Sequence, residues 1–202
     1  MPQNNRHVIR PSRGRPPTTE PDHVGLVALR LFAEHGFEAT TLDDIAAAAG
    51  VGRRTLFRYF PSKNDLVWGD FDRVLDRLRD DLEATSPDEP LMAAIARAVV
   101  ASNEYADEQL HELRLRMTLI TTVPALQGHA MLRYAAWRRV VAEFAAARLG
   151  QTPDDLVPTT IGQTALGTSM AAFTVWVTHP ERDLRATLEA GYGLLAGGYA
   201  DL

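Results

Sequence analysis

The sequence predicts an all-α protein of about nine helices, with an N-terminal helix-turn-helix domain followed by a C-terminal helical domain. Three observations predict this class. Apolar residues recur at helical spacing along almost all of the 202-residue chain after residue 18. Helix-capping pairs, glycines and prolines divide these segments from one another. Strand signals are missing, because no Asn-Gly or Asp-Gly turn lies between alternating apolar and polar runs.

The first predicted helix spans 20–35. Thr19 with Asp22 has the spacing of a capping box, and Gly36 is suited to end the helix. Residues 1–17, by contrast, are polar and rich in Pro, Arg and Gly without any periodicity, so we expect a disordered basic arm.

Two short helices follow. Thr41 with Asp44 forms a second capping box that opens a helix over 42–49, and Gly50 ends it. The next helix spans 53–60, because Pro61 disfavours helical geometry in the residue before it.

One long helix over 62–85 comes next, opened by the capping pair Ser62 and Asp65. The alanine-rich second half is helical throughout, with boundaries uncertain by roughly 2 to 4 residues. Its predicted helices lie near 90–105, 107–121, 125–149, 155–178 and 182–199.

Charge and composition limit the function. The chain has no cysteine, which excludes a disulfide scaffold and a thiol enzyme. The net charge of −5 is unevenly distributed. Residues 1–63 hold nine basic and six acidic side chains, whereas the remaining residues hold twelve basic and twenty acidic ones. Such asymmetry indicates that the N-terminal part faces nucleic acid. Without an apolar run of 18 residues, we expect a cytoplasmic protein that makes no membrane contact.

The predicted helices over 42–49 and 53–60 are joined by a Gly-containing turn. In helix-turn-helix proteins, such a pair places its second helix in the DNA major groove. Leu56 and Phe60, four residues apart, must face the core. The opposite face then presents side chains that pair with bases or phosphates. These candidates are Arg53, Arg54, Thr55, Arg58 and Tyr59, with Thr40, Thr41 and Lys63 as flanking phosphate contacts.

A fixed pattern of residues surrounds these helices. It comprises Phe37, Thr40-Thr41, Ile45-Ala46, Ala49-Gly50-Val51, Thr55-Leu56-Phe57, Tyr59-Phe60, Ser62-Lys63 and Leu66. Over about residues 18–78 this pattern resembles the DNA-binding domain of the TetR family of bacterial regulators. Stretches 52–60 and 62–71 are similar to its mycofactocin-system branch. The resemblance implies a DNA-binding domain over 18–78 with its motif at 41–60, and a ligand-binding and dimerisation domain over 79–202. Phe57, a further DNA-contact candidate, stands where the family most often has tyrosine, and Gly52 where serine or threonine is common.

The arm holds Arg13 and Arg15 on either side of a glycine, an arrangement narrow enough for the minor groove of A·T-rich DNA. A solubilising tail is an equally good interpretation of the same residues.

For a ligand pocket we expect apolar and aromatic side chains with a few polar groups among them, although ordinary core packing remains open for each. An arginine at the pocket mouth suits an anionic ligand with an apolar tail, such as a fatty acyl-CoA. The candidates are Asn103, Met117, Ile120, Met131, Tyr134, Trp137, Arg138 and Phe173. Small and apolar residues on the last two helices are candidates for a homodimer interface or for packing within one chain: Ala165, Ser169, Ala172, Trp176, Leu188 and Leu195.

The sequence therefore predicts a homodimeric regulator, a repressor that binds a palindromic DNA operator and is released by a small effector. It indicates no catalytic residues, cofactor or metal. Residues 191–196 match a dinucleotide-binding fingerprint, but no strand is predicted before them, and such a site needs one. The alternative is a helical enzyme or small-molecule carrier whose N-terminal helices do not bind DNA.

Overall fold

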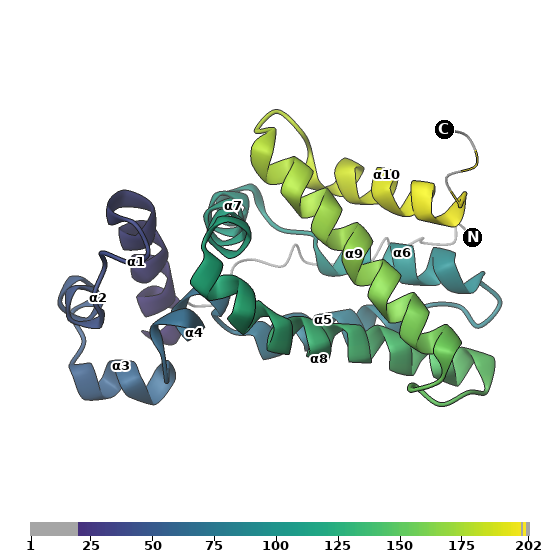
Figure 1. The fold of residues 1–202 in the computed structure, drawn as a ribbon, viewed down its shortest axis with the longest axis horizontal. Helices are drawn as coiled ribbons and strands as arrows, with labels where there is room; N and C mark the ends of the chain where they lie inside the picture. Colours follow the sequence, from purple (N-terminus) through teal and green to yellow (C-terminus); the bar gives the residue numbers. More distant parts are fainter. Residues whose placement is uncertain (1–19, 199, 201–202) are drawn as a thin grey trace, which may run out of the picture.

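The computed structural model describes residues 20–198 and 200, and within them every regular element is an α-helix (Figure 1). The all-α prediction is confirmed, with ten helices in the described residues where about nine were expected. The predicted arm, with Arg13 and Arg15, and the Thr19 half of the first capping box lie outside the described residues. The helices are α1 (Glu20–His35), α2 (Leu42–Ala49), α3 (Arg53–Tyr59), α4 (Lys63–Trp68), α5 (Phe71–Glu83), α6 (Leu91–Ser102), α7 (Asp107–Thr122), α8 (Pro124–Leu149), α9 (Leu156–Thr178) and α10 (Leu184–Ala196).

Local capping explains why α2 begins and ends where it does. The Thr41 hydroxyl accepts from the Asp44 amide at 3.1 Å, and the Asp44 carboxylate accepts from the Thr41 amide at 2.9 Å. Gly50 adopts the left-handed conformation, with φ 68°, and its N–H bonds to carbonyls of the last turn. Glycine adopts this conformation without steric cost, so the helix stops there.

The prediction of one helix over 62–85 is wrong, because the chain breaks at Gly69. This residue has φ 57° and ψ −142°, a conformation that a side chain disfavours. Directly after it, the Asp70 side chain accepts from the Arg73 amide at 3.2 Å and so starts α5 as a new helix. A Cβ atom at Gly69 would lie 3.0 Å from a guanidinium nitrogen of Arg116. The backbone conformation therefore favours glycine at the break, and a Cβ atom there would also require the Arg116 side chain to shift.

The second half is built around α9, which packs most extensively against α8 and α10 (Figure 1). The crossing of α8 and α9 is close, since a Cβ atom at Gly162 would lie 2.8 Å from the Arg138 carbonyl oxygen. The buried apolar residues form one continuous cluster that includes members from α1 to α10. The N-terminal helices are thus packed onto the C-terminal part through a shared core.

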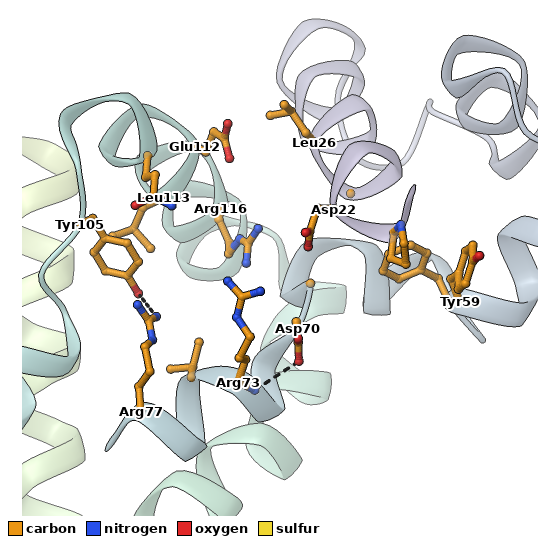
Figure 2. A pocket seen from close by; sticks show the side chains of 16 residues that line it. Asp22, Leu26, Tyr59, Asp70, Arg73, Arg77, Tyr105, Glu112, Leu113 and Arg116 are labelled. Atoms are coloured by element: carbon orange, nitrogen blue, oxygen red, sulfur yellow. Dashed lines mark hydrogen bonds between the residues drawn. The ribbon is translucent and has the colours of Figure 1, made fainter. Parts of the chain in front are cut away.

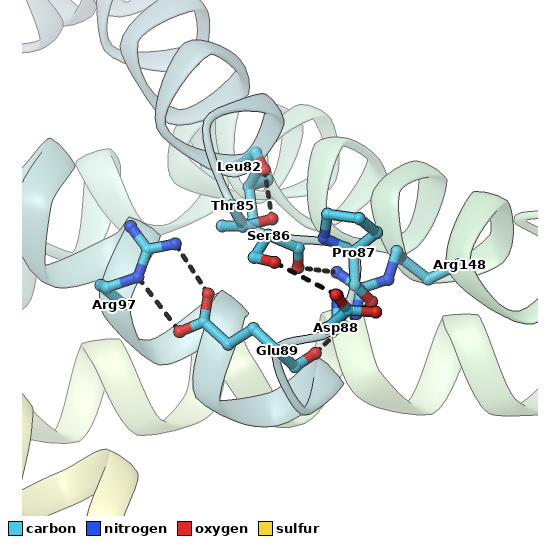
Figure 3. Close-up of polar contacts among 8 residues, drawn as sticks. All are labelled: Leu82, Thr85, Ser86, Pro87, Asp88, Glu89, Arg97 and Arg148. Atoms are coloured by element: carbon cyan, nitrogen blue, oxygen red, sulfur yellow. Dashed lines mark hydrogen bonds and ion pairs between the residues drawn. The ribbon is translucent and has the colours of Figure 1, made fainter.

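Arg148 fixes the connection between α5 and α6 to the end of α8 (Figure 3). Its guanidinium donates to the carbonyls of Ser86, Pro87 and Glu89 at 3.2, 2.7 and 2.6 Å. The Glu89 carboxylate in turn accepts two hydrogen bonds from Arg97, at 3.1 and 2.7 Å. Hydrogen bonds from a charged donor are the stronger kind, so this connection is held rigidly.

None of the helices in the described ranges combines the length and apolar character that crossing a bilayer requires.

Candidate functional site

The surface of α3 separates into a covered and an open face. Leu56 is fully buried and Phe60, just after the helix, is 6% exposed, so this side is anchored in the core. Thr55 and Tyr59 are half-buried, whereas the side chains of Arg53, Arg54, Phe57 and Arg58 are exposed. The open face of this short helix therefore carries three guanidinium groups and one aromatic ring.

Two of these arginines are held in place without being covered. The Arg53 guanidinium lies 3.2 Å from the Asp43 carboxylate, and both side chains are about two-thirds exposed. Arg58 donates to the Tyr59 hydroxyl at 2.7 Å and lies 4.6 Å from the centre of its ring. Exposed ion pairs are worth only about 0–1 kcal/mol, so exchanging Asp43 for a phosphate or a base edge costs little.

Phe57 is 41% exposed on α3, although a phenyl ring gains nothing from contact with water. Its ring centre lies 5.7 Å from the Arg53 guanidinium carbon. An apolar ring between arginines is suited to contact a thymine methyl group in the major groove.

The threonines predicted as phosphate contacts are engaged inside the chain. Thr40 is 3% exposed, and its hydroxyl donates to the carbonyls of Gly36 and Leu31. It therefore offers no free hydroxyl to a phosphate, which corrects that prediction. Thr41 is exposed, but its hydroxyl belongs to the capping box of α2.

Lys63, predicted as a flanking contact, folds back over the first helices. Its ammonium donates to the Glu38 carbonyl at 3.3 Å and lies 4.4 Å from the centre of the Phe37 ring. The lysine is half-buried there, against the connection between α1 and α2.

The residues predicted for a ligand pocket do not form one wall. Met131 is 58% exposed on α8 and so faces away from the interior, which corrects its assignment. Asn103 is half-buried, but its amide donates to the Val99 carbonyl at 2.8 Å, so it completes the end of α6. Arg138 is half-buried. The remaining apolar candidates lie in the core: Met117, Ile120, Trp137 and Phe173.

Tyr134 is the exception, because it lies where α8 meets α4. Its ring packs edge-on against Trp68, with centres 5.6 Å apart. The Tyr134 hydroxyl and the Trp68 ring nitrogen are both covered, and neither has a hydrogen-bond partner within the described part of the chain. Burial raises the pKa of Tyr134 to about 12, so the hydroxyl keeps its proton and remains a donor.

Asp65 links the same two helices. One carboxylate oxygen accepts from the Ser62 amide and hydroxyl in the capping box of α4. The other lies 3.1 Å from Arg133 and 3.3 Å from His129, both on α8. Capping chemistry alone predicts Asp65 as a helix residue. Its contact with α8 joins residues 68 positions apart, for which the sequence carries no signal.

The ion pair makes stability depend on pH. Burial by itself raises the pKa of Asp65, but hydrogen bonds from Ser62 and Arg133 and the charge of His129 outweigh it and hold the pKa below the usual 3.8. A group whose pKa is lowered on folding contributes stability above its unfolded pKa and loses it as the pH falls through the folded pKa. Asp65→Asn is therefore expected to lower the free energy of unfolding by about 1–2 kcal/mol at pH 7. This difference from the wild type should shrink as the pH falls below 3.8.

Urea unfolding at a series of pH values measures this difference. Asp72→Asn, at an exposed position on α5, serves as the matched control and should stay within about 0.5 kcal/mol of the wild type. A difference for Asp65→Asn that stays constant down to pH 2.5 would contradict the assignment.

The residues predicted for a dimer interface are used mostly within the chain. Ala165, Ser169, Ala172, Trp176 and Leu188 are all at most 5% exposed, and Leu195 is half-buried. The Tyr192 hydroxyl explains part of this, since it donates to the Ala165 carbonyl at 3.0 Å and lies 2.9 Å from the Ser169 hydroxyl. A residue already covered in one chain offers no surface to a second copy. Three apolar side chains on the same helices do remain exposed, Leu156, Val157 and Leu194, as does Leu149 at the end of α8.

Comparison with known proteins gives a consistent result. A model of bacterial regulatory proteins of the tetR family matches residues 26–67, and a model of the MftR C-terminal domain matches 89–200. The chain is 39% identical over 185 residues to a mycofactocin biosynthesis transcriptional regulator, MftR, of Mycobacterium tuberculosis, covering 92% of this chain and 93% of the relative.

Solved structures share the fold. The fatty acid degradation regulator FadR of Bacillus halodurans aligns with a TM-score of 0.65 at 22% identity, over 93% of this chain and 99% of that one. The Thermus thermophilus FadR, a transcriptional repressor in complex with lauroyl-CoA, aligns with a TM-score of 0.55 at 24% identity. The alignment covers 88% of this chain and 94% of that one.

Proposed function

This chain belongs to the TetR family of bacterial transcriptional regulators, and we propose that it is a repressor that binds a palindromic operator as a homodimer and leaves it when a small effector binds. The matched family consists of regulators, so the alternative of a helical enzyme is set aside. We also propose a division at residue 78, with the DNA-binding part before it. The two family models lie on either side of α5, which supports this division.

The observation that carries the DNA-binding proposal is the open face of α3. Arg53, Arg54 and Arg58 project from a helix that Leu56 anchors in the core. Arginine pairs bidentately with guanine in the major groove, and a helix is the element that fits this groove. In a two-fold dimer, two copies of α3 would enter successive major grooves about 34 Å apart.

The homodimer would use the outer surface of the C-terminal helices. Leu149, Leu156, Val157 and Leu194 are exposed there, and Leu156 reaches 81%. Exposed apolar side chains are candidates for an interaction site, and two-fold symmetry would bring the same side chains from both copies together.

We propose that the effector is a small apolar molecule or a fatty acyl-CoA. The support is the fold shared with Thermus thermophilus FadR, a protein that binds lauroyl-CoA, and the covered polar atoms of Trp68 and Tyr134 where α4 meets α8. An effector at this contact would move α4, the helix that follows the reading helix. To lower operator affinity it must bind the DNA-incompetent state more tightly than the competent one.

The basic arm, with Arg13 and Arg15, is proposed to reach the minor groove beside the operator half-site. Removing residues 1–17 would then flatten the dependence of binding on salt concentration.

Operator binding by arginine variants tests the main proposal. A palindrome from the promoter region of the protein's own gene is labelled, and its affinity is measured by fluorescence anisotropy at physiological salt. Arg54→Ala and Arg58→Ala are each expected to weaken binding by about 5- to 150-fold, because one bidentate base contact is worth about 1–3 kcal/mol.

Arg182→Ala is the matched control, since this exposed arginine lies in the connection between α9 and α10. It removes the same charge far from α3 and should leave affinity within a factor of about two. If the α3 variants bind as tightly as this control does, α3 does not read the operator.

A further inference from the structure

A cleft of about 470 Å³ lies between the N-terminal helices and the C-terminal part. Its walls come from α1, from α5 and from α7, with Gly69 and Asp70 between them and Tyr59 at the end of α3 (Figure 2). None of the residues predicted for the apolar effector lines this cleft. Its volume falls within the usual range for small-molecule sites, which is roughly 300–1,000 Å³.

Three guanidinium groups from two helices converge on the cleft. Arg73 and Arg77 come from α5 and Arg116 from α7, and Figure 2 shows Arg73 and Arg116 pointing toward one another. Like charges that face each other repel, so the arrangement is stabilised when an anion lies between them.

Not all hydrogen-bond donors of these three arginines have a partner in the part of the chain that the structure describes. Arg116 donates to the Trp68 carbonyl at 3.0 Å, and Arg77 donates to the Tyr105 hydroxyl at 3.2 Å. In both side chains the Nε atom is covered and has no hydrogen-bond partner among the described residues. The Arg73 guanidinium makes no hydrogen bond or ion pair to any residue in the described ranges. The Arg73 guanidinium is thus available to a ligand in the cleft.

Acidic residues also line the cleft. The Asp70 carboxylate accepts from the Arg73 amide as the cap of α5. Burial lowers the pKa of Arg116, and the neighbouring charges, including Glu112 and Asp22, only partly offset this. The buried cation therefore gains from any further anion that enters the cleft.

We propose that this cleft binds the phosphate group of a small molecule, held by Arg73, Arg77 and Arg116. Guanidinium groups match the oxygens of a phosphate bidentately, and three of them can serve all of its oxygens. The remaining volume accommodates more than a single phosphate ion. The phosphate belongs either to the head group of a coenzyme A thioester or to a separate nucleotide-like molecule.

Occupancy of the cleft would act on the N-terminal helices. Asp22 of α1 lies on the opposite wall and exerts its charge on Arg116. A bound phosphate would compete with Asp22 for this arginine and repel it, which favours a state in which α1 is displaced from α7. Only this regulatory consequence rests on the proposed function, because the binding site itself does not require an operator.

Isothermal titration calorimetry with the full-length protein tests the site. Inorganic pyrophosphate, coenzyme A, lauroyl-CoA and laurate are titrated into the wild type and Arg73→Gln. Arg73 is chosen because its guanidinium has no contact on which folding depends. The variant is expected to bind the phosphate-bearing probes about tenfold or more weakly and laurate unchanged.

Arg79→Gln is the control, since Arg79 lies on α5 and pairs with Asp76 outside the cleft. It should bind like the wild type. Tighter binding of lauroyl-CoA than of pyrophosphate, with both lowered by Arg73→Gln, assigns the site to the effector head group. Equal binding of pyrophosphate and both coenzyme A compounds, lowered in the same way, assigns it to a separate phosphate ligand.

The proposal is overturned if no phosphate-bearing probe binds at millimolar concentration, or if Arg73→Gln and Arg79→Gln bind every probe equally. Operator binding measured on the same proteins keeps the two proposals apart. A wild type that binds the operator but no phosphate-bearing probe contradicts the cleft proposal alone. A wild type that binds these probes but no operator contradicts the proposed function alone.

Discussion

Trp176→Ala is expected to lower the free energy of unfolding by about 3–5 kcal/mol, the range for removing a large aromatic side chain from a core. Trp176 is 2% exposed on α9 and packs edge-on against Phe173, with ring centres 6.3 Å apart. The Arg114 guanidinium lies 3.9 Å from the Trp176 ring centre and also donates to its carbonyl. The substitution therefore leaves a cavity and removes the cation–π partner of a half-buried arginine.

Denaturant unfolding followed by circular dichroism measures this loss. Thr174→Ala provides a control on the exposed face of the same helix and should change the unfolding free energy by no more than about 0.5 kcal/mol. A loss below 1 kcal/mol for Trp176→Ala would mean that the core around α9 is not packed as described.

Leu56→Ala is expected to cost about 2–5 kcal/mol and to weaken operator binding as well. Leu56 is fully buried and is the residue of α3 that anchors it in the core. Without the leucine, α3 loses the packing that holds its arginines at a fixed angle. Binding requires this angle, so affinity should fall although no residue of the open face has changed.

Leu56→Met separates packing from chemistry, because it keeps most of the volume and should cost less than about 1.5 kcal/mol. Unfolding and operator affinity are measured on both variants. An alanine variant as stable as the methionine variant, or one that binds the operator like the wild type, would contradict the anchoring role.

Local chemistry made the N-terminal helices predictable. The capping pair of Thr41 and Asp44 and the left-handed glycine at Gly50 act within a few residues, so their sequence signals and their structures coincide. The break at Gly69 was not predicted, because the helical spacing of apolar residues continues across it, from Val67 to Phe71. Gly69 followed by Asp70 was the available signal, since glycine ends helices and aspartate starts them.

The candidate sites were predictable only in part. Which face of α3 is open follows from Leu56 and Phe60, two apolar residues four positions apart. Small residues on a helix, such as Ala165, indicate close packing but do not specify whether the neighbour belongs to the same chain. The part played by Arg116 depends on its bond to Trp68, 48 residues away, and no local pattern encodes a contact of that range.

The break between α4 and α5 also determines what kind of motion can pass along the chain. A continuous helix transmits a rotation about its axis from one end to the other. Two helices joined at Gly69 do not, because the backbone dihedrals of a single residue can absorb the twist. We expect a displacement to reach α4 sideways, through the Arg116 bond to its last carbonyl, the Arg133 contact with Asp65 and the packing of Tyr134 on Trp68. In the proposed mechanism, an effector would therefore act on α4 through these lateral contacts and not through the stiffness of one continuous helix.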